Sequence, residues 1–264
     1  MDGFGFSVAG LVVGTAVGAT GVGGGSLMTP ILILFYGISP AVAVGTDLIY
    51  ASLSKSFGVY LHVRRNTVDW KIVGWLAAGS VPATLLTLLL LHAWGGGPSL
   101  DKLIKLTLSI AIILTACFTL AQDRALKYVR QHERLQFLRG LRQRWQIPAT
   151  ILSGALVGTV VTISSVGAGV IGMTLLLLLY PQVSPIRLVG SDMAHAVLIT
   201  GIAGLGHARL GTVDYSMLGY LLIGALPGIW LGTRIGFSLP PAPLKRAIAF
   251  FLIFIGTTTL LKAL

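Results

Sequence analysis

Apolar segments fill almost the whole chain and are separated by short polar stretches. Six of them contain about 20 residues, which is the length that a transmembrane helix needs. Two others, residues 5–36 and 147–180, are too long for one straight span and too short for two. The eight segments are 5–36, 41–62, 70–92, 102–122, 147–180, 185–207, 214–236 and 243–263. This pattern predicts an all-α integral membrane protein.

The composition agrees with a membrane protein and excludes several other classes. Of the 264 residues, 55% are hydrophobic and 10% are charged, whereas a soluble domain carries about 25% charged residues. The net charge of +11 reports the orientation of basic loops in a membrane protein, so we do not expect nucleic-acid binding. The lone Cys117 excludes a disulfide framework and a two-cysteine redox relay.

The two halves of the chain are copies of one another. Residues 38–82 align without a gap on residues 183–227, and 16 of the 45 aligned positions are identical. An internal duplication in a membrane chain is typical of a transporter with its site where the repeats meet, and a duplicated scaffold is the alternative. The predicted organisation is a first transmembrane repeat (1–122), a basic cytoplasmic loop (123–146) and a second transmembrane repeat (147–264).

The distribution of lysine and arginine favours inverted repeats. If each long segment is a re-entrant hairpin, each repeat crosses the membrane three times. Fourteen basic residues then lie on one side of the membrane and four on the other. If each long segment crosses once, the repeats are parallel and the ratio is twelve to six; Lys55 is left out of both counts. Because positive residues concentrate on the cytoplasmic side, we expect two inverted repeats, each a glycine-broken, re-entrant helix followed by three transmembrane helices. The expected location is the inner (cytoplasmic) membrane.

The loop at 123–146 carries seven basic residues, and its leucines recur at helical spacing. Part of the loop is therefore a candidate to lie on the anionic inner leaflet. A solvated linker between the repeats is the alternative.

Glycine-rich breaks interrupt both long segments. The stretch GATGVGGGSLMTP (18–30) has five glycines in eight residues, and TISSVGAG (162–169) falls in the second copy. Non-helical backbone survives at membrane depth only where it lines a cavity or is buried in protein. The N–H groups that begin the next helix suit an anion, so we predict a binding site for a small oxyanion, with close helix packing as the alternative. The residues predicted at the breaks are Gly23, Gly24, Gly25, Ser26, Ser164, Ser165, Gly167, Ala168 and Gly169.

Four ionisable residues lie in the apolar helices that follow the breaks: Asp47, Lys55, Asp192 and His195. Such side chains are costly in a membrane and indicate function by default. Lys55 is predicted to face the anion, with an ion pair to Asp47 as the structural alternative. Asp192 and His195 share a helix face, which makes His195 a candidate proton carrier.

The neighbours of these residues complete the prediction. Asp47 and Asp192 are alternatively helix caps after the Ser-Pro turns. The adjacent hydroxyls of Thr46 and Ser191 complete the predicted substrate-binding set.

Equivalent turns, HVRRNTVDW (62–70) and HARLGTVDY (207–215), join the next helices. Their threonines, Thr67 and Thr212, are predicted to be N-caps, and His62 and His207 are expected at the membrane interface. Neither histidine has the company of Cys, His or carboxylates that a metal site needs, so we expect no metal and no cofactor.

These residues resemble a known family. GVGGG followed by a helix and proline, AVAVGTDLIYA, VDWKIVGWLAAGSVPATLL, LVGSDMAHA and LPGIWLGTRI look like the TauE/SafE family of sulfite exporters, also called the sulfonate permease family. The resemblance covers nearly the whole chain except the central loop. It implies transport of small sulfur anions such as sulfite, sulfoacetate or other C2 sulfonates across the bacterial cytoplasmic membrane, in the direction of export.

Three function classes compete. A secondary transporter of small sulfur-containing anions is the main prediction, and an anion channel or a transporter of another small organic anion is the alternative. A membrane-embedded enzyme is not expected, because no nucleophile–base pair or pair of catalytic carboxylates is evident. The expected partners are a small anionic substrate and the lipid bilayer, and a homodimer is left open.

Overall fold

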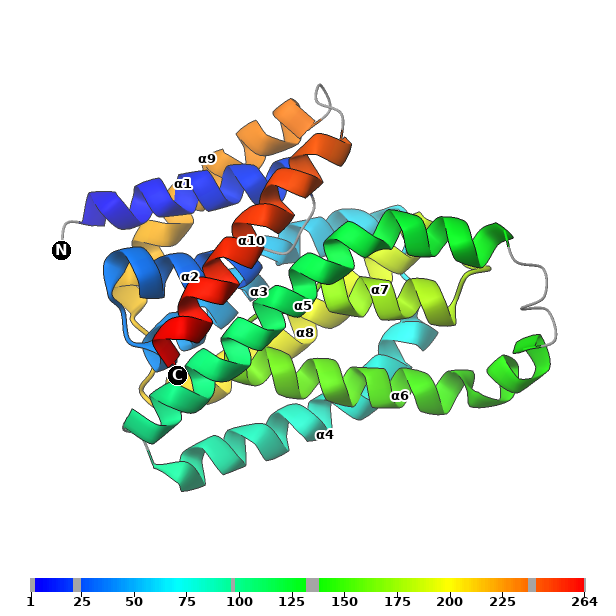
Figure 1. Cartoon of the computed structure of the whole chain (residues 1–264), viewed down its shortest axis with the longest axis horizontal. Helices are drawn as coiled ribbons and strands as arrows, with labels where there is room; N and C mark the ends of the chain where they lie inside the picture. Colours follow the sequence, from blue (N-terminus) through cyan, green and yellow to red (C-terminus); the bar gives the residue numbers. More distant parts are fainter. Residues whose placement is uncertain (1–2, 21–24, 96–97, 132–137, 237–240, 264) are drawn as a thin grey trace.

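The computed structural model describes residues 3–20, 25–95, 98–131, 138–236 and 241–263, and every regular element in this part of the chain is an α-helix (Figure 1). The helices are α1 (Gly3–Thr20), α2 (Gly25–Tyr36), α3 (Pro40–Arg64), α4 (Trp70–Trp94), α5 (Pro98–Gln131), α6 (Leu138–Ser164), α7 (Val170–Leu179), α8 (Pro185–Arg209), α9 (Tyr215–Gly236) and α10 (Pro241–Ala263).

Five described helices contain stretches that are long and apolar enough to cross a bilayer. These stretches are Trp70–Trp94, Asp101–Leu120, Trp145–Ser164, Pro185–Arg209 and Tyr215–Arg234. The prediction of an all-α membrane protein is confirmed at this level.

Each long segment folds back on itself as a helical hairpin. In the second half, the Gln146 amide donates to the carbonyl oxygen of Leu179 (2.7 Å), and a hydrogen bond of 2.8 Å joins the hydroxyls of Thr150 and Tyr180. In the first half, the Tyr36 hydroxyl donates to the carbonyl oxygen of Gly5 at 2.6 Å. The end of α7 therefore lies beside the early part of α6, and the end of α2 lies beside the start of α1.

The central helices α3 and α8 are antiparallel. Both begin at a Ser-Pro pair, in which the proline takes the first helical turn and the serine is the N-cap. Early in α3, Gly45 packs against the backbone of Thr212, which follows α8. Near the other end of α3, Gly58 lies against Met193, early in α8. This reversed pairing brings the middle of each helix against the middle of its copy.

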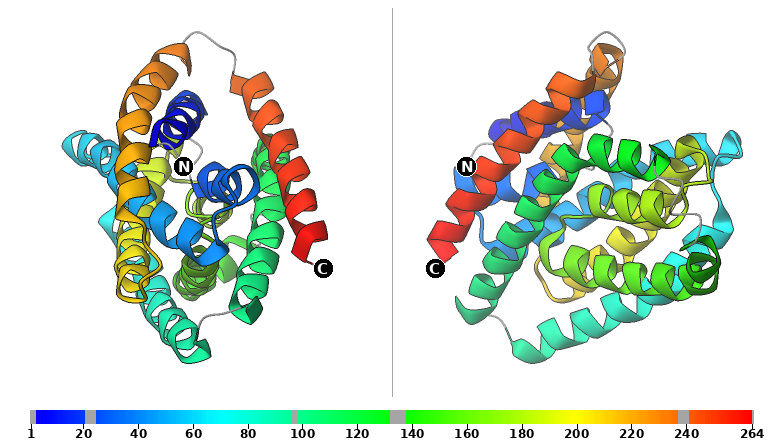
Figure 2. Two further views of the ribbon diagram at one scale, coloured as in Figure 1. Left: turned by 90° about the vertical axis from the view of Figure 1, so that its left-hand side faces the viewer. Right: turned by 45° about the vertical axis from the view of Figure 1, so that its right-hand side comes forward.

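The outer helices pair across the two halves of the chain. Figure 2 shows α1 beside α9 and α10 beside α5, and α4 packs on α6 in the same way as α9 packs on α1. Glycines let the backbones approach closely, as small residues do in membrane helix pairs. A Cβ atom at Gly14 would collide with the backbone of Ala225, and one at Gly79 would collide with that of Ile151. Gly18, the first glycine of the predicted break, packs against Ile229 in this way, so the packing alternative is correct for it.

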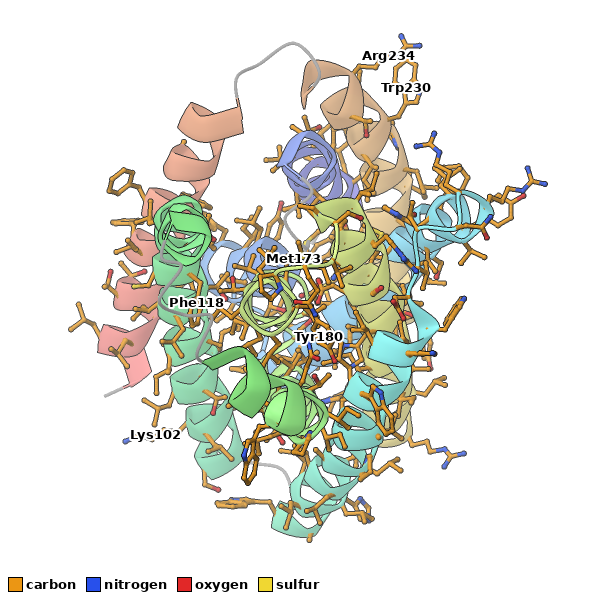
Figure 3. All side chains as sticks on the ribbon, turned by 90° about the vertical axis from the view of Figure 1, so that its right-hand side faces the viewer. Lys102, Phe118, Met173, Tyr180, Trp230 and Arg234 are labelled. Carbon is orange, nitrogen blue, oxygen red and sulfur yellow. The ribbon has the colours of Figure 1, made fainter. Side chains whose placement is uncertain are left out.

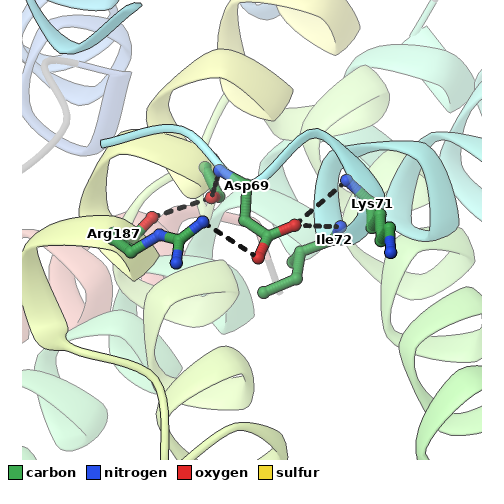
Figure 4. Close-up of polar contacts among 5 residues, drawn as sticks. Asp69, Lys71, Ile72 and Arg187 are labelled. Atoms are coloured by element: carbon green, nitrogen blue, oxygen red, sulfur yellow. Dashed lines mark hydrogen bonds and ion pairs between the residues drawn. The ribbon is translucent and has the colours of Figure 1, made fainter. Parts of the chain in front are cut away.

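The turn before α4 corrects the predicted caps. The Asp69 carboxylate, not Thr67, caps the helix by accepting from the backbone N–H of Lys71 (3.1 Å) and of Ile72 (Figure 4). Thr67 instead donates to the carbonyl oxygen of His62 at 3.0 Å, since it closes the preceding helix. In the same way, Asp214 accepts from the N–H of Met217 at 2.9 Å in the second copy.

The prediction for His207 needs correction. His207 is buried rather than interfacial: its ring contacts the Thr212 hydroxyl (2.9 Å) and the carbonyl oxygen of Thr162 (3.0 Å).

The segment 123–146 is helical at both ends, since α5 continues to Gln131 and α6 begins at Leu138. This agrees with the helical spacing of its leucines.

Candidate functional site

The break between α6 and α7 is a buried turn of irregular backbone. Three of its residues have left-handed backbone conformations, with φ of 59° at Ser165, 107° at Gly167 and 132° at Gly169. Ser164 ends α6 and holds the turn: its hydroxyl donates to the carbonyl oxygen of Val160 (2.7 Å) and accepts from the N–H of Val166 (3.2 Å). The glycines are needed here because side chains disfavour positive φ. The predicted break is therefore present in the second copy.

Lys55 reaches this break from the middle of α3. Its Nζ donates to the carbonyl oxygen of Ala168 at 2.9 Å. An ammonium group has three hydrogens, and among the described residues this is the one hydrogen bond that it makes. Lys55 is thus placed to donate to a ligand beside the break.

A cavity of about 70 Å³ opens at the Lys55 side chain. Its walls are Lys55, Gly169, Met173, Val189, Asp192, Met193 and Ala196. Figure 3 shows Met173 inside the helix bundle, whereas Lys102 and the Trp230–Arg234 pair point outward. On this measure of volume one water needs about 10–15 Å³, so the cavity suits a few waters or a small ion rather than a large molecule.

Lys55 forms no close ion pair with the carboxylate of Asp47 or Asp192 among the described side chains. Lys55 interacts electrostatically with Asp192 most strongly and with Asp47 less. Neither carboxylate lies within 4.0 Å of its ammonium, since the one ion pair among the described side chains joins Arg187 and Asp69 at 3.6 Å. A direct Lys55–Asp47 ion pair within 4.0 Å is therefore absent among the described side chains, although the two groups interact electrostatically.

Asp47 is fully buried but lies outside the cavity walls. The Thr29 hydroxyl of α2 donates to Asp47 Oδ2 at 2.5 Å. The proposed capping role is wrong, because Ser39 and Ser184 are the N-caps and the two aspartates lie inside their helices. Asp192 differs from its copy, since its carboxylate lies against Gly172 and lines the cavity.

Three other predicted residues lie away from the cavity. Thr46 Oγ1 accepts from the N–H of Asp214 (3.0 Å), and Ser191 Oγ accepts from the N–H of Asp69 (2.8 Å). Each of these hydroxyls ties its helix to the turn of the other half. His195 Nε2 is hydrogen-bonded to the Ser80 hydroxyl of α4 at 2.8 Å, so it does not join Asp192 at the cavity.

The first break is only partly visible. Gly23 and Gly24 lie outside the described residues, as does the side chain of Ser26, while Gly25 begins α2. Sequence reasoning missed four cavity-lining residues that carry no charge or glycine signal, which are Met173, Val189, Met193 and Ala196.

Comparison with known proteins places the chain in a family. Residues 6–259 match the family model described as sulfite exporter TauE/SafE. The chain is 36% identical over 256 residues to the probable membrane transporter protein YjnA of Bacillus subtilis, covering 94% of this chain and 95% of YjnA. It is 28% identical to the probable membrane transporter protein YdhB of the same organism, covering 90% of this chain and 91% of YdhB.

A third relative is a probable membrane transporter protein of Xylella fastidiosa, which is 24% identical over 93% of this chain and 90% of its own length. No solved structure matches the chain. With five helices suited to crossing a bilayer and a family model that spans nearly its whole length, the chain is a multi-pass membrane transporter of the TauE/SafE family.

Proposed function

We propose that the protein is a secondary transporter that binds one small anion at a time beside Lys55. The observation that carries this proposal is the position of Lys55, whose ammonium lies at a small cavity between the central helices and the α6–α7 break. A lysine at the centre of a membrane helix costs about 2.5–3.5 kcal/mol. A chain that retains this lysine next to a cavity gains a cationic ligand for an anion.

Backbone groups of the break add to the attraction for an anion. Gly169 lines the cavity and is the N-cap of α7. The first N–H groups of a helix carry about half a positive charge. Lys55 and the start of α7 together give a positive side to the cavity, and Asp192 faces them from α8.

The proposed substrates are sulfite, sulfoacetate or related organosulfonates, exported across the inner membrane. This part of the proposal draws on the description of the family as sulfite exporters. The cavity supports it in two ways. Its volume of about 70 Å³ suits a small oxyanion head group, and Met173 and Met193 offer polarisable surface to the rest of the substrate.

We further propose that the two halves are inverted repeats whose hairpins are re-entrant. The antiparallel pairing of α3 with its copy α8 supports inversion, because inverted repeats run equivalent helices in opposite directions. The lengths support re-entrance: α7 has 10 residues, about 15 Å, which is half of a bilayer core of about 30 Å. Two broken helices that meet at mid-membrane are the arrangement in which transporters bind substrate.

A ligand screen on the purified protein tests the proposal. Sulfite, sulfate, isethionate, sulfoacetate and taurine are compared with acetate and malonate by the shift in melting temperature. We expect the sulfur anions to raise the melting temperature, and to raise it further as their concentration increases above Kd, since a ligand stabilises the state that binds it. Stabilisation by the carboxylates alone would redirect the assignment to organic acids. A protein stabilised by none of these anions would contradict it.

A further inference from the structure

Among the described residues, one carboxylate oxygen of Asp47 lacks a hydrogen bond of good geometry. The Thr29 hydroxyl donates to Oδ2, whereas the buried Oδ1 receives no hydrogen bond of this quality. Among the described side chains, three buried polar atoms lack a partner, and these are Asp47 Oδ1, Ser165 Oγ and Thr115 Oγ1. Buried polar groups are nearly always paired, so an exception calls for an explanation.

Two of these atoms belong to neighbouring side chains. Ser165, which is 2% exposed, interacts with the Asp47 carboxylate, but this contact does not reach the geometry of a full hydrogen bond. A hydroxyl can donate to a carboxylate and can equally accept from a carboxylic acid. Ser165 can therefore satisfy Asp47 in either protonation state after a small movement of the break. A group that carries a proton needs this property, because both of its states must be tolerated.

The charge balance indicates when the proton is bound. Lys55 carries one positive charge, whereas Asp47 and Asp192 together carry two negative charges when both are ionised. An incoming anion adds a further negative charge to a region of low dielectric constant, where uncompensated charge is costly. One proton on Asp47 restores the charge that the site had before the anion arrived.

Asp47 suits this role better than the other acidic and basic groups nearby. Asp192 lines the anion cavity and is the stronger electrostatic partner of Lys55. His195 is engaged with Ser80 and lies outside the cavity walls. Among the described residues, the titratable groups that act on Asp47 are Lys55 and Tyr50 of its own helix. Helix α2 presents the hydroxyl and a backbone group of Thr29, and the break presents the hydroxyl of Ser165.

We propose that Asp47 binds one proton for each anion that the protein moves, with Ser165 as its hydrogen-bond partner in both states. This inference rests on the proposed function. Proton and anion act on the same segment, because Ser165 and the Ala168 carbonyl that holds Lys55 belong to one turn. The proton comes from the water on the side where the anion enters and leaves with the anion on the other side. The direction of net movement then follows the sum of the anion and proton gradients.

Calorimetry on the detergent-solubilised wild-type protein tests the stoichiometry. Isethionate and methanesulfonate are the probes, because each is a monoanion throughout the range between pH 5 and 8. Titration in buffers with different ionisation enthalpies gives the number of protons taken up with the anion. We expect close to one proton per anion where Asp47 is ionised before binding, and a tenfold loss of affinity per pH unit in that range. Anion binding without proton uptake at every pH would overturn the inference and leave the proposed function intact.

Two variants locate the proton. Asp47→Asn resembles the protonated acid, so its affinity should be independent of pH and close to the wild-type value at low pH. Asp214→Asn, which alters a capping carboxylate at the start of α9, should retain the wild-type pH slope. An Asp47→Asn protein whose anion affinity still changes with pH as the wild type does would also overturn the inference. If Asp47→Asn does not fold, the proton count on the wild type still decides. A wild-type protein that binds neither probe at any pH would contradict the proposed function itself.

Discussion

Lys55 is the residue that distinguishes this site from a packing contact. In the alignment of the two halves of the chain Lys55 is matched by Thr200, so only one of the two aligned positions carries an ammonium group. Its contact with the carbonyl oxygen of Ala168 joins α3 of the first half to the break of the second. Asp192, from the second half, completes the charged side of the same cavity.

Lys55→Met should abolish anion binding while the protein still folds. Methionine keeps most of the length of the side chain but removes the charge. The melting temperature of the free protein should stay the same or rise, because an ammonium in a membrane interior is costly. Affinity for isethionate should fall at least tenfold, measured by calorimetry. Lys102→Met, at an outward-pointing lysine (Figure 3), is the matched control, and equal losses in both variants would contradict the assignment.

At the scale of elements, the α6–α7 break contributes two groups to the cavity region, a carbonyl oxygen and a helix N-cap. Its carbonyl at Ala168 accepts a hydrogen bond from Lys55, and its last residue, Gly169, is the N-cap of α7 and lines the cavity. The turns after α3 and α8 instead join the two halves of the chain. Ser191 of α8 accepts a hydrogen bond from the turn after α3, and Thr46 of α3 accepts one from the turn after α8. Binding and assembly are therefore assigned to separate segments, and mutations should separate them.

Ala168→Leu should weaken anion binding more than it lowers stability. The larger side chain displaces the turn whose carbonyl holds Lys55, so affinity for isethionate should fall about tenfold or more, which corresponds to roughly 1.4 kcal/mol. Ala203→Leu is the control: Ala203 is fully buried in α8 and lies outside the cavity. Overpacking at either position typically costs about 1–3 kcal/mol. Near-normal affinity in folded Ala168→Leu protein would leave the break as a packing device.

Ser191→Ala and Thr46→Val should lower stability without changing anion affinity. Each change removes the acceptor for a backbone N–H at the start of a helix in the other half, at a cost of about 1 kcal/mol. The fall in melting temperature should be similar for the two variants. Thr174→Val, which removes a hydroxyl that bonds only within its own helix, should have a smaller effect. A large loss of affinity in Ser191→Ala would place that hydroxyl in the binding site after all.

At the scale of the whole molecule, the two halves are interleaved rather than adjacent. Helix α1 packs on α9 and α6 packs on α4, while α3 and α8 cross at the centre. Neither half can bury its own glycine-lined helix faces without the other. The cavity forms between these halves, with Lys55 from one and Asp192 from the other.

The sequence was informative about the structural class because apolar length is a local signal. It also singled out Lys55, Asp192 and Gly169, which the structure places at one cavity, since charge and glycine are conspicuous in a membrane helix. It did not reveal which hydroxyls face the cavity. Thr46 and Ser191 lie beside aspartates in the sequence, yet they point to the turns of the opposite half because a helix rotates neighbouring residues by about 100°. The cavity walls at Met193 and Ala196 depend on how α8 meets α3, which no local pattern encodes.

Accessibility of the two matching turns tests the proposed inversion. Asn66→Cys and Gly211→Cys place single thiols at equivalent positions, in a Cys117→Ala background. With inverted repeats, a thiol reagent that does not cross membranes should reach position 66 from the cytoplasmic side and position 211 from outside. Labelling is measured in right-side-out and inverted membrane vesicles. Reaction of both thiols from the same side would contradict the inverted arrangement.

Anion flux in proteoliposomes, compared between the wild type and Lys55→Met, tests whether the protein is a transporter that binds its anion beside Lys55. Initial rates of sulfite and isethionate efflux are measured per protein over a range of internal concentrations. We expect wild-type flux to saturate with anion concentration, because each transport cycle passes through one bound state. We expect Lys55→Met to give no more flux than empty liposomes. Saturating flux at the wild-type rate in the Lys55→Met protein would remove Lys55 from the site. Wild-type flux that rises linearly without saturation would indicate an open channel and contradict the transporter assignment.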